Sequence, residues 1–199
     1  MRTMILRRFN PIDVTDLGNR AGWNVAAMVA LSLIGACVTG LLAQLRVPIP
    51  GTPVPVTGQV LAVLVFGTVL GSGYGALSQV LYIGMGLMGM PWFTGWKSGM
   101  VVLAGPTGGY LVGFMVAALF LGTVSERGPG ARTIGGQLAR MLAAVGLIWF
   151  FGVSHMLLLG CDISTAIMWG LVPFIAADVL KAMMAASFTS VVLSKRARS

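Results

Sequence analysis

Charge is what this sequence has least of. Only 9% of its 199 residues are charged, and only 5 are aspartate or glutamate, whereas soluble domains carry about 25% charged residues. Cysteine and histidine are nearly absent as well, with Cys37, Cys161 and His155 as the full set. Without a CxxC pair or a Cys/His cluster, the sequence predicts neither a metal site nor a disulfide framework. We expect no cofactor, and we expect His155 to pack within a helix or to line polar space.

Catalytic signatures are missing too. The sequence has no HExxH, GxSxG or paired-aspartate motif. Its GWKSG segment at 95–99 resembles the end of a phosphate-binding loop, but Trp96 separates Gly95 from Lys97 and the earlier glycine spacing is wrong. The two-fold repeats of many secondary transporters are also absent. We therefore expect neither an enzyme nor an ATPase.

Apolar residues are abundant. They make up 57% of the chain, and about 20 of them in a helix cross the hydrocarbon core of a bilayer. We predict an all-α integral membrane protein with a single membrane domain: a bundle of six transmembrane helices over 23–193, a cytoplasmic segment at 1–22 and a basic cytoplasmic tail at 194–199. The first segment lacks the apolar core of a cleavable signal peptide. The spans are expected at roughly 23–45, 57–71, 73–90, 106–124, 135–160 and 166–193.

The placement of the basic residues predicts the orientation. The net charge of +8 alone could indicate nucleic acid, but the basic residues lie mostly at the ends and in one loop, between long neutral tracts. With six spans, ten of them fall on the side of both termini: Arg2, Arg7, Arg8, Arg20, Arg127, Arg132, Arg140, Lys195, Arg196 and Arg198. Only Arg46 and Lys97 fall on the other side. Because basic residues concentrate in cytoplasmic loops, we predict cytoplasmic termini and no nucleic-acid partner.

Two segments between the spans are expected to be loops on the external side. The segment 46–59 has four prolines, at 48, 50, 53 and 55, so it should be stiff and extended. The segment 89–110 mixes aromatic residues, glycines and one lysine. Since irregular backbone near a membrane is tolerated only where it is buried or lines a cavity, we expect a lid over a pocket. Within the bundle, the glycine-rich GSGYG at 71–75 should form a tight turn between two antiparallel helices.

Small residues recur every four positions on the first span. Small residues at that spacing let helices approach closely in lipid. Two interpretations stay open: internal packing, or an outward docking face for a partner helix. The residues concerned are Ala26, Ala30, Ser32, Ala36 and Gly40.

Two charges, Asp178 and Lys181, lie within the apolar last span, roughly 12 and 15 residues from its start. Each costs roughly 2.5–3.5 kcal/mol near the bilayer centre. Residues three apart share a helix face, so the two could form a structural ion pair or a polar patch facing a cavity. In the second case, neighbouring segments supply further candidates: Gln59, Gln79, Tyr82 and Thr107 as hydrogen-bonding partners, and Trp92, Phe93 and Trp96 as walls around an apolar ligand. Apolar walls with a few placed polar groups are typical of small-molecule sites.

Four segments closely resemble the BioY family, the biotin-specific substrate-capture (S) components of energy-coupling-factor (ECF) transporters. They are PVPVTGQ (53–59), GALSQVLYIGMGLMGMPWF (75–93), GPTGGYLVGF (105–114) and VPFIAADVLK (172–181), and the resemblance covers about 20–195. The chain departs from the commoner family pattern at FTGWKSG (93–99), where a more glycine-rich run is expected.

The resemblance implies a six-helix bundle in a bacterial or archaeal cytoplasmic membrane, with biotin bound near the external face. It implies a transmembrane coupling protein and two cytoplasmic ATPases as partners, although a standalone transporter stays possible. Asp178 would recognise the ureido ring, Lys181 would belong to the same site, and Lys181, Lys97 or Arg46 would pair with the carboxylate. The competing interpretations are a capture subunit for another vitamin, an intramembrane enzyme and a structural membrane protein.

Overall fold

The computed structural model describes residues 25–125 and 133–196, and these ranges hold nearly all of the predicted bundle. The segment 1–22 and several of the basic residues used for the orientation, Arg127 among them, lie outside the described residues. The elements are α2 (Val25–Gln44), β1 (Arg46–Val47), β2 (Val56–Thr57), α3 (Gln59–Leu87), α4 (Met100–Ala104), α5 (Gly108–Val124), α6 (Ile134–Leu158), α7 (Ile163–Gly170), the 3₁₀-helix η1 (Val172–Phe174) and α8 (Ile175–Arg196).

Within the described ranges, four helical stretches are long and apolar enough to cross a membrane, and α5 is a shorter apolar helix. The four are Val25–Gln44, Gln59–Leu87, Ile134–Leu158 and Ile163–Lys195. Their charged residues are few, so a helical bundle in a bilayer is the arrangement in which these segments are stable. The predicted helical membrane bundle is confirmed.

Helix α3 reverses direction at Gly71. This residue has φ +81° and ψ 177°, a conformation that only glycine adopts without strain. The side-chain amide of Gln59 donates to the hydroxyl of Tyr82 at 2.8 Å, although 23 residues of straight helix would separate them by about 35 Å. Likewise, a Cβ on Gly75 would lie 2.8 Å from the Cα of Gly67. The antiparallel turn predicted at 71–75 is confirmed, and Gly71 itself makes it.

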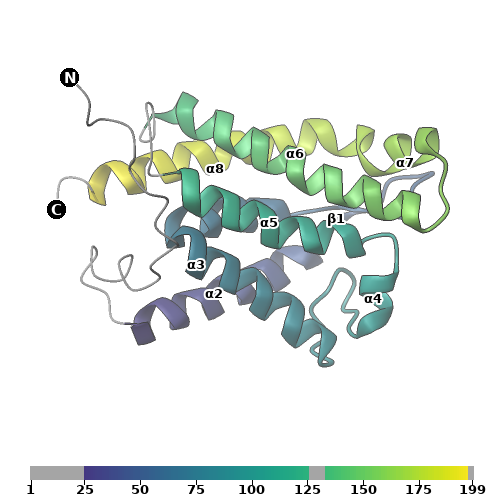
Figure 1. Cartoon of the computed structure of the whole chain (residues 1–199), viewed down its shortest axis with the longest axis horizontal. Helices are drawn as coiled ribbons and strands as arrows, with labels where there is room; N and C mark the ends of the chain where they lie inside the picture. Colours follow the sequence, from purple (N-terminus) through teal and green to yellow (C-terminus); the bar gives the residue numbers. More distant parts are fainter. Residues whose placement is uncertain (1–24, 126–132, 197–199) are drawn as a thin grey trace, which may run out of the picture.

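The two limbs of α3 form the centre of the bundle. Helix α3 packs against α2, α5 and α8, while α6 packs against α5 and α8. In Figure 1, α2 begins and α8 ends at the left of the molecule, whereas α4 and α7 lie at the right. The two loops of the sequence prediction therefore meet at the end of the bundle opposite the last turn of α8.

The proline-rich segment forms a narrow hairpin instead of a single extended strand. Strands β1 and β2 pair antiparallel, with Arg46 opposite Thr57 and Val47 opposite Val56, and all four prolines lie between them. Proline lacks the N–H that a strand interior needs, which explains why the pairing stops at two residues. The second loop contains the short helix α4 and a tight turn in which Phe93 pairs with Lys97.

The last predicted span, 166–193, lies within one apolar helical stretch, Ile163–Lys195, but the helix is interrupted inside it. Helix α7 ends at Gly170, η1 follows, and α8 begins at Ile175. Pro173 explains the break, because it has no N–H to donate and disfavours helical geometry in the residue before it. Asp178 consequently lies in the first turn of α8 and not deep inside one long helix.

The row of small residues on α2 divides into two sets. Ser32, Ala36 and Gly40 are buried. Ser32 donates to the carbonyl of Tyr74 at 3.0 Å, and a Cβ on Gly40 would lie 3.0 Å from the Trp92 ring. For these three, the docking interpretation is wrong and internal packing is confirmed.

Ala26 and Ala30 are exposed. They belong to a different face of α2 because residues two apart along a helix, such as Ala30 and Ser32, point in nearly opposite directions.

Candidate ligand-binding pocket

A pocket opens at the loop end of the bundle, between α3, α5, α6, α8 and the two loops. The space between its walls amounts to about 560 Å³, including the part open to solvent. Its polar lining residues are Thr57, Gln59, Tyr82, Thr94, Thr107, Tyr110, Asp178 and Lys181. Its apolar lining residues include Val54, Val60, Phe93, Leu111, Phe114, Ile148 and Phe174. We call this space the inner pocket.

An ion pair lines the inner pocket. The ammonium of Lys181 lies 2.7 Å from Oδ1 of Asp178, and Asp178 is almost fully buried. The indole N–H of Trp149 donates to Oδ2 of Asp178 at 2.9 Å. Both carboxylate oxygens thus meet donors, as buried polar groups require in apolar surroundings. The predicted ion pair exists, and it also faces a cavity, so the two interpretations of these charges are compatible.

A hydrogen-bonded network forms one wall. Gln59 donates to the hydroxyl of Tyr82, and its Oε1 accepts from Thr57 at 2.9 Å and from Thr94 at 3.2 Å. The network joins β2, both limbs of α3 and the second loop. It therefore couples the position of both loops to the polar groups of the wall.

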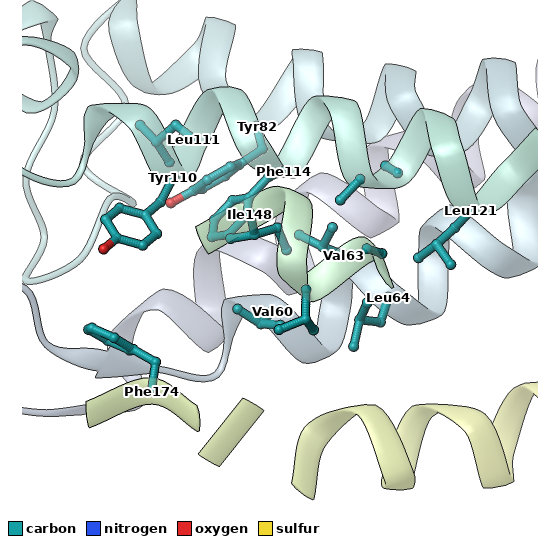
Figure 2. Packing of buried hydrophobic residues seen from close by; sticks show 14 of the residues in the cluster. Val60, Val63, Leu64, Tyr82, Tyr110, Leu111, Phe114, Leu121, Ile148 and Phe174 are labelled. Atoms are coloured by element: carbon teal, nitrogen blue, oxygen red, sulfur yellow. The ribbon is translucent and has the colours of Figure 1, made fainter. Parts of the chain in front are cut away.

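Aromatic rings form much of the apolar lining of the inner pocket. The Tyr82 and Phe93 rings meet edge to face, with centroids 5.4 Å apart. Tyr110 and Phe174 lie at one end of the cluster drawn in Figure 2, and their ring centroids are 6.0 Å apart. The hydroxyl of Tyr110 donates to the carbonyl of Gly170 at 2.6 Å, which attaches α5 to the end of α7.

The beginning of α7 is fixed by a capping residue. Asp162 accepts from the backbone N–H of Thr165 at 2.9 Å, as helix N-caps commonly do. Hydrogen bonds from Thr165 hold the pKa of this exposed carboxyl below its usual value. At the other end of α7, the carbonyl of Trp169 accepts from Thr52 at 2.9 Å, so α7 also holds the proline-rich loop.

The structure brings together six of the predicted site residues and separates three. Gln59, Tyr82, Phe93, Thr107, Asp178 and Lys181 line the inner pocket. Gln79 is fully buried elsewhere and donates to Thr39 of α2 at 3.3 Å. Trp92 turns away and donates to the carbonyl of Tyr82 at 2.8 Å. Lys97 lines a second space outside the inner pocket.

Sequence reasoning missed Trp149, Tyr110 and Phe174 as site residues. Tyr110 and Phe174 stand inside two of the segments quoted for the family resemblance, and Phe174 lies one helical turn before Asp178, so a signal was present. Trp149 is 29 residues from Asp178 in an apolar helix, where nothing in the sequence marks it. Trp96, expected as a pocket wall, is 66% exposed.

The loop that carries Phe93 is held by Gln44, the last residue of α2. The side-chain amide of Gln44 donates to the carbonyls of Trp92 and Phe93, both at 3.1 Å. Its oxygen accepts from the backbone N–H of Trp96 at 3.1 Å. Trp96 has φ +61°, which is uncommon for a bulky residue, and this hydrogen bond helps to hold it there.

The fold defines a class: a multi-pass helical membrane protein, here with a pocket under the loops at one end of its bundle. A family model described as the BioY family matches residues 14–198. The chain belongs to the BioY family.

Named relatives and one solved structure agree with this membership. The chain is 38% identical over 157 residues to the "Biotin transporter BioY" of Thermotoga maritima, covering 79% of this chain and 86% of that protein. It is 38% identical over 137 residues to the "Probable biotin transporter BioY" of Methanothermobacter thermautotrophicus, covering 65% and 87%. A crystal structure of the S-component for biotin from an ECF-type ABC transporter has the same fold, with a TM-score of 0.75 at 21% identity over 92% of this chain and 94% of that one.

Proposed function

We propose that this protein binds biotin in the inner pocket and takes it up across the membrane as the substrate-specific subunit of an ECF-type transporter. The buried Asp178, which is held by Lys181 and Trp149 and lines an otherwise uncharged pocket, is the observation that carries this proposal. The chain is then a transport protein and not an enzyme.

The chemistry of biotin fits the pocket at three points. Its ureido ring offers two N–H donors, and a carboxylate has about four lone-pair sites, so Asp178 can accept from the ligand while it keeps Lys181 and Trp149. Its fused rings are apolar and can pack against the aromatic side chains of Tyr82, Phe93 and Phe174. Its tail ends in a carboxylate, for which Lys181, Lys97 and Arg46 are the candidate cations, and Thr107 lines the path between the two spaces. Gln79 and Trp92 would act only by supporting the walls.

The six-span topology is part of the proposal. The reversal at Gly71 divides α3 into two limbs, α5 is a further crossing, and α7 with α8 together forms the last one. The bias of basic residues then puts both termini in the cytoplasm. Since the loops lie at the opposite end of the bundle (Figure 1), the inner pocket faces the outside of a bacterial or archaeal cell.

Uptake would need partners. Because the sequence has no ATP-binding motif, we expect a transmembrane coupling protein and two cytoplasmic ATPases to supply the energy. Ala26 and Ala30 are exposed on α2 and small enough for close helix contact in lipid, so the proposed docking face is now limited to these two. A standalone transporter and a capture subunit for another vitamin are the alternatives.

A binding panel tests the proposal. The full chain, purified in nanodiscs, is assayed with radiolabelled biotin and with other vitamins as competitors. We expect saturable binding of biotin alone and a loss of about ten- to a hundredfold in affinity for Asp178→Asn, because hydrogen bonds to charged groups contribute roughly 1.5–3 kcal/mol.

The matched control is Asp162→Asn, the same change at an exposed carboxyl whose capping role asparagine preserves. Its biotin affinity should equal that of the wild type. Stronger binding of another vitamin would replace biotin as the substrate, and unchanged affinity in a correctly inserted Asp178→Asn protein would remove Asp178 from the site.

A further inference from the structure

A second space lies directly outside the inner pocket, and we call it the outer chamber. It measures about 1520 Å³, open solvent included, which makes it larger than the inner pocket. Four residues line both spaces: Pro55, Thr94, Val102 and Thr107. The two spaces therefore adjoin each other at these four residues, and Asp178 lines the inner one.

The outer chamber has charge of one sign. Arg46 and Lys97 both line it. The described residues include only two carboxylate side chains, Asp162 and Asp178, and neither of them lines this chamber. The positive charge of the chamber is thus not neutralised by an acidic side chain of the described parts of the chain, and an anion placed there would be attracted.

The backbone fixes where both cations stand. Arg46 belongs to β1 and pairs with Thr57, while Lys97 closes the tight turn opposite Phe93. A guanidinium nitrogen of Arg46 lies so near Gly95 that a Cβ there would be 2.5 Å away. The two cations therefore belong to adjoining segments on the same rim. Lys181, in contrast, is engaged with Asp178 at 2.7 Å.

We propose that the outer chamber is a second subsite, which admits amide-linked conjugates of biotin whose added part carries an acid group. This inference rests on the proposed function and extends its substrate class from free biotin to anionic amino-acid amides of biotin. The ring system occupies the inner pocket, and the linker passes Thr94 and Thr107, whose hydroxyl groups can bond to an amide. The acid group of the added amino acid then reaches Arg46 and Lys97.

The test compares two nearly isosteric conjugates in competition with radiolabelled biotin. One is biotin joined through its carboxyl group to the amino group of glutamate, and the other is the same conjugate with both acids converted to amides. We expect both to bind the wild-type protein and the charged one to bind about three- to tenfold more tightly, which is the range for two exposed ion pairs. The preference should shrink as salt rises.

Variants assign the preference to the two cations. In an Arg46→Gln/Lys97→Gln double variant, the ratio of the two affinities should fall to about one. Lys195→Gln, at the far end of α8, should leave the ratio as it is in the wild type. An unchanged ratio in the double variant would overturn the inference.

The failure of this inference is distinct from failure of the proposed function. If free biotin binds and neither conjugate competes, the outer chamber does not admit extended ligands and the inference is wrong. Equal binding of the charged and neutral conjugates would also overturn it, because the cations would then have no part. If free biotin itself does not bind, the result contradicts the proposed function, and the inference is wrong with it.

Discussion

The indole N–H of Trp149 on α6 donates to Oδ2 of Asp178 on α8 at 2.9 Å, while Lys181 holds Oδ1 at 2.7 Å. The carboxylate is therefore fixed from two helices before any ligand arrives. A fixed acceptor loses less entropy on binding than a rotating one, so Trp149 is expected to act on affinity through Asp178 and not by touching the ligand.

The first prediction concerns this hydrogen bond. Trp149→Phe keeps most of the ring and removes the N–H, and we expect biotin affinity to fall about three- to tenfold, near the net value of a typical hydrogen bond. In an Asp178→Asn background, the same change should reduce the affinity for biotin much less, because the effects of the two residues are coupled. Binding of radiolabelled biotin to the four proteins of this cycle measures the coupling.

Trp169→Phe is the matched control for that cycle. Trp169 is exposed on α7, and its side chain does not line the inner pocket. Its bond to Thr52 is made by the backbone carbonyl, which the substitution keeps. The affinity of the Trp169→Phe variant for biotin should stay at the wild-type level. Additive losses for Trp149→Phe and Asp178→Asn would show that Trp149 does not work through the carboxylate.

Much of this architecture was predictable from local features of the sequence. Apolar runs predicted the long helices, and the glycines around Gly71 predicted the reversal, because only glycine adopts that backbone conformation without strain. Asp178 and Lys181 were recognisable because isolated charges are rare in apolar helices. In each case the signal lies within a few residues of the feature.

What escaped prediction depends on contacts between distant segments. Nothing near Trp149 marks it as a partner of Asp178, since the two meet only when α6 packs on α8. Gln79 lies three residues from Tyr82, yet it points to Thr39 of α2 while Tyr82 lines the pocket, so neighbouring positions on one helix serve different interfaces. The break before α8 was different, because Pro173 was visible in the sequence and its effect on the helix was overlooked.

The second prediction concerns the stability of the ion pair. Lys181→Met leaves a buried carboxylate with Trp149 as its remaining partner, and breaking a buried pair costs roughly 3–5 kcal/mol. We expect a lower thermal midpoint in detergent. The double variant Asp178→Leu/Lys181→Met removes both charges, so it should recover most of that stability while failing to bind biotin. A double variant less stable than Lys181→Met would mean that the pair is needed for the fold itself.

The third prediction concerns Gln44, which joins the end of α2 to the loop that carries Phe93. Gln44→Met keeps the length of the side chain and removes its hydrogen bonds to Trp92, Phe93 and Trp96. We expect the loop to open more often, so trypsin should cleave after Lys97 faster and biotin should dissociate faster. Mass spectrometry of timed digests and a chase with unlabelled biotin give the two rates.

The rate of cleavage after Arg46, on the other loop, is the internal control for the digest. It should change less than the rate of cleavage after Lys97, because the hydrogen bonds that Gln44→Met removes are made to the loop that carries Phe93 and Lys97. If the rates of cleavage at both sites increase by the same factor, the substitution has loosened the whole end of the bundle. Gln44 then does not specifically stabilise the loop that carries Phe93.

The fourth prediction concerns the proposed docking face on α2. Ala30 is exposed, whereas Ala36 on the same helix is completely buried. Ala30→Trp adds a large ring on the lipid side, where it should keep a coupling protein from approaching closely without disturbing the inner pocket. We expect copurification with the coupling protein to be lost and biotin affinity to remain unchanged.

Ala36→Trp separates docking from folding, because overpacking a filled interior typically costs 1–3 kcal/mol or more. This variant should lose stability and biotin binding together, whether or not a partner is present. Ala26→Trp, one turn before Ala30 on the exposed face, should behave like Ala30→Trp. If the Ala26 and Ala30 variants both bind biotin and still copurify with the coupling protein at wild-type yield, the docking surface lies on another helix. If they lose biotin binding as Ala36→Trp does, this face of α2 supports the bundle and not a partner.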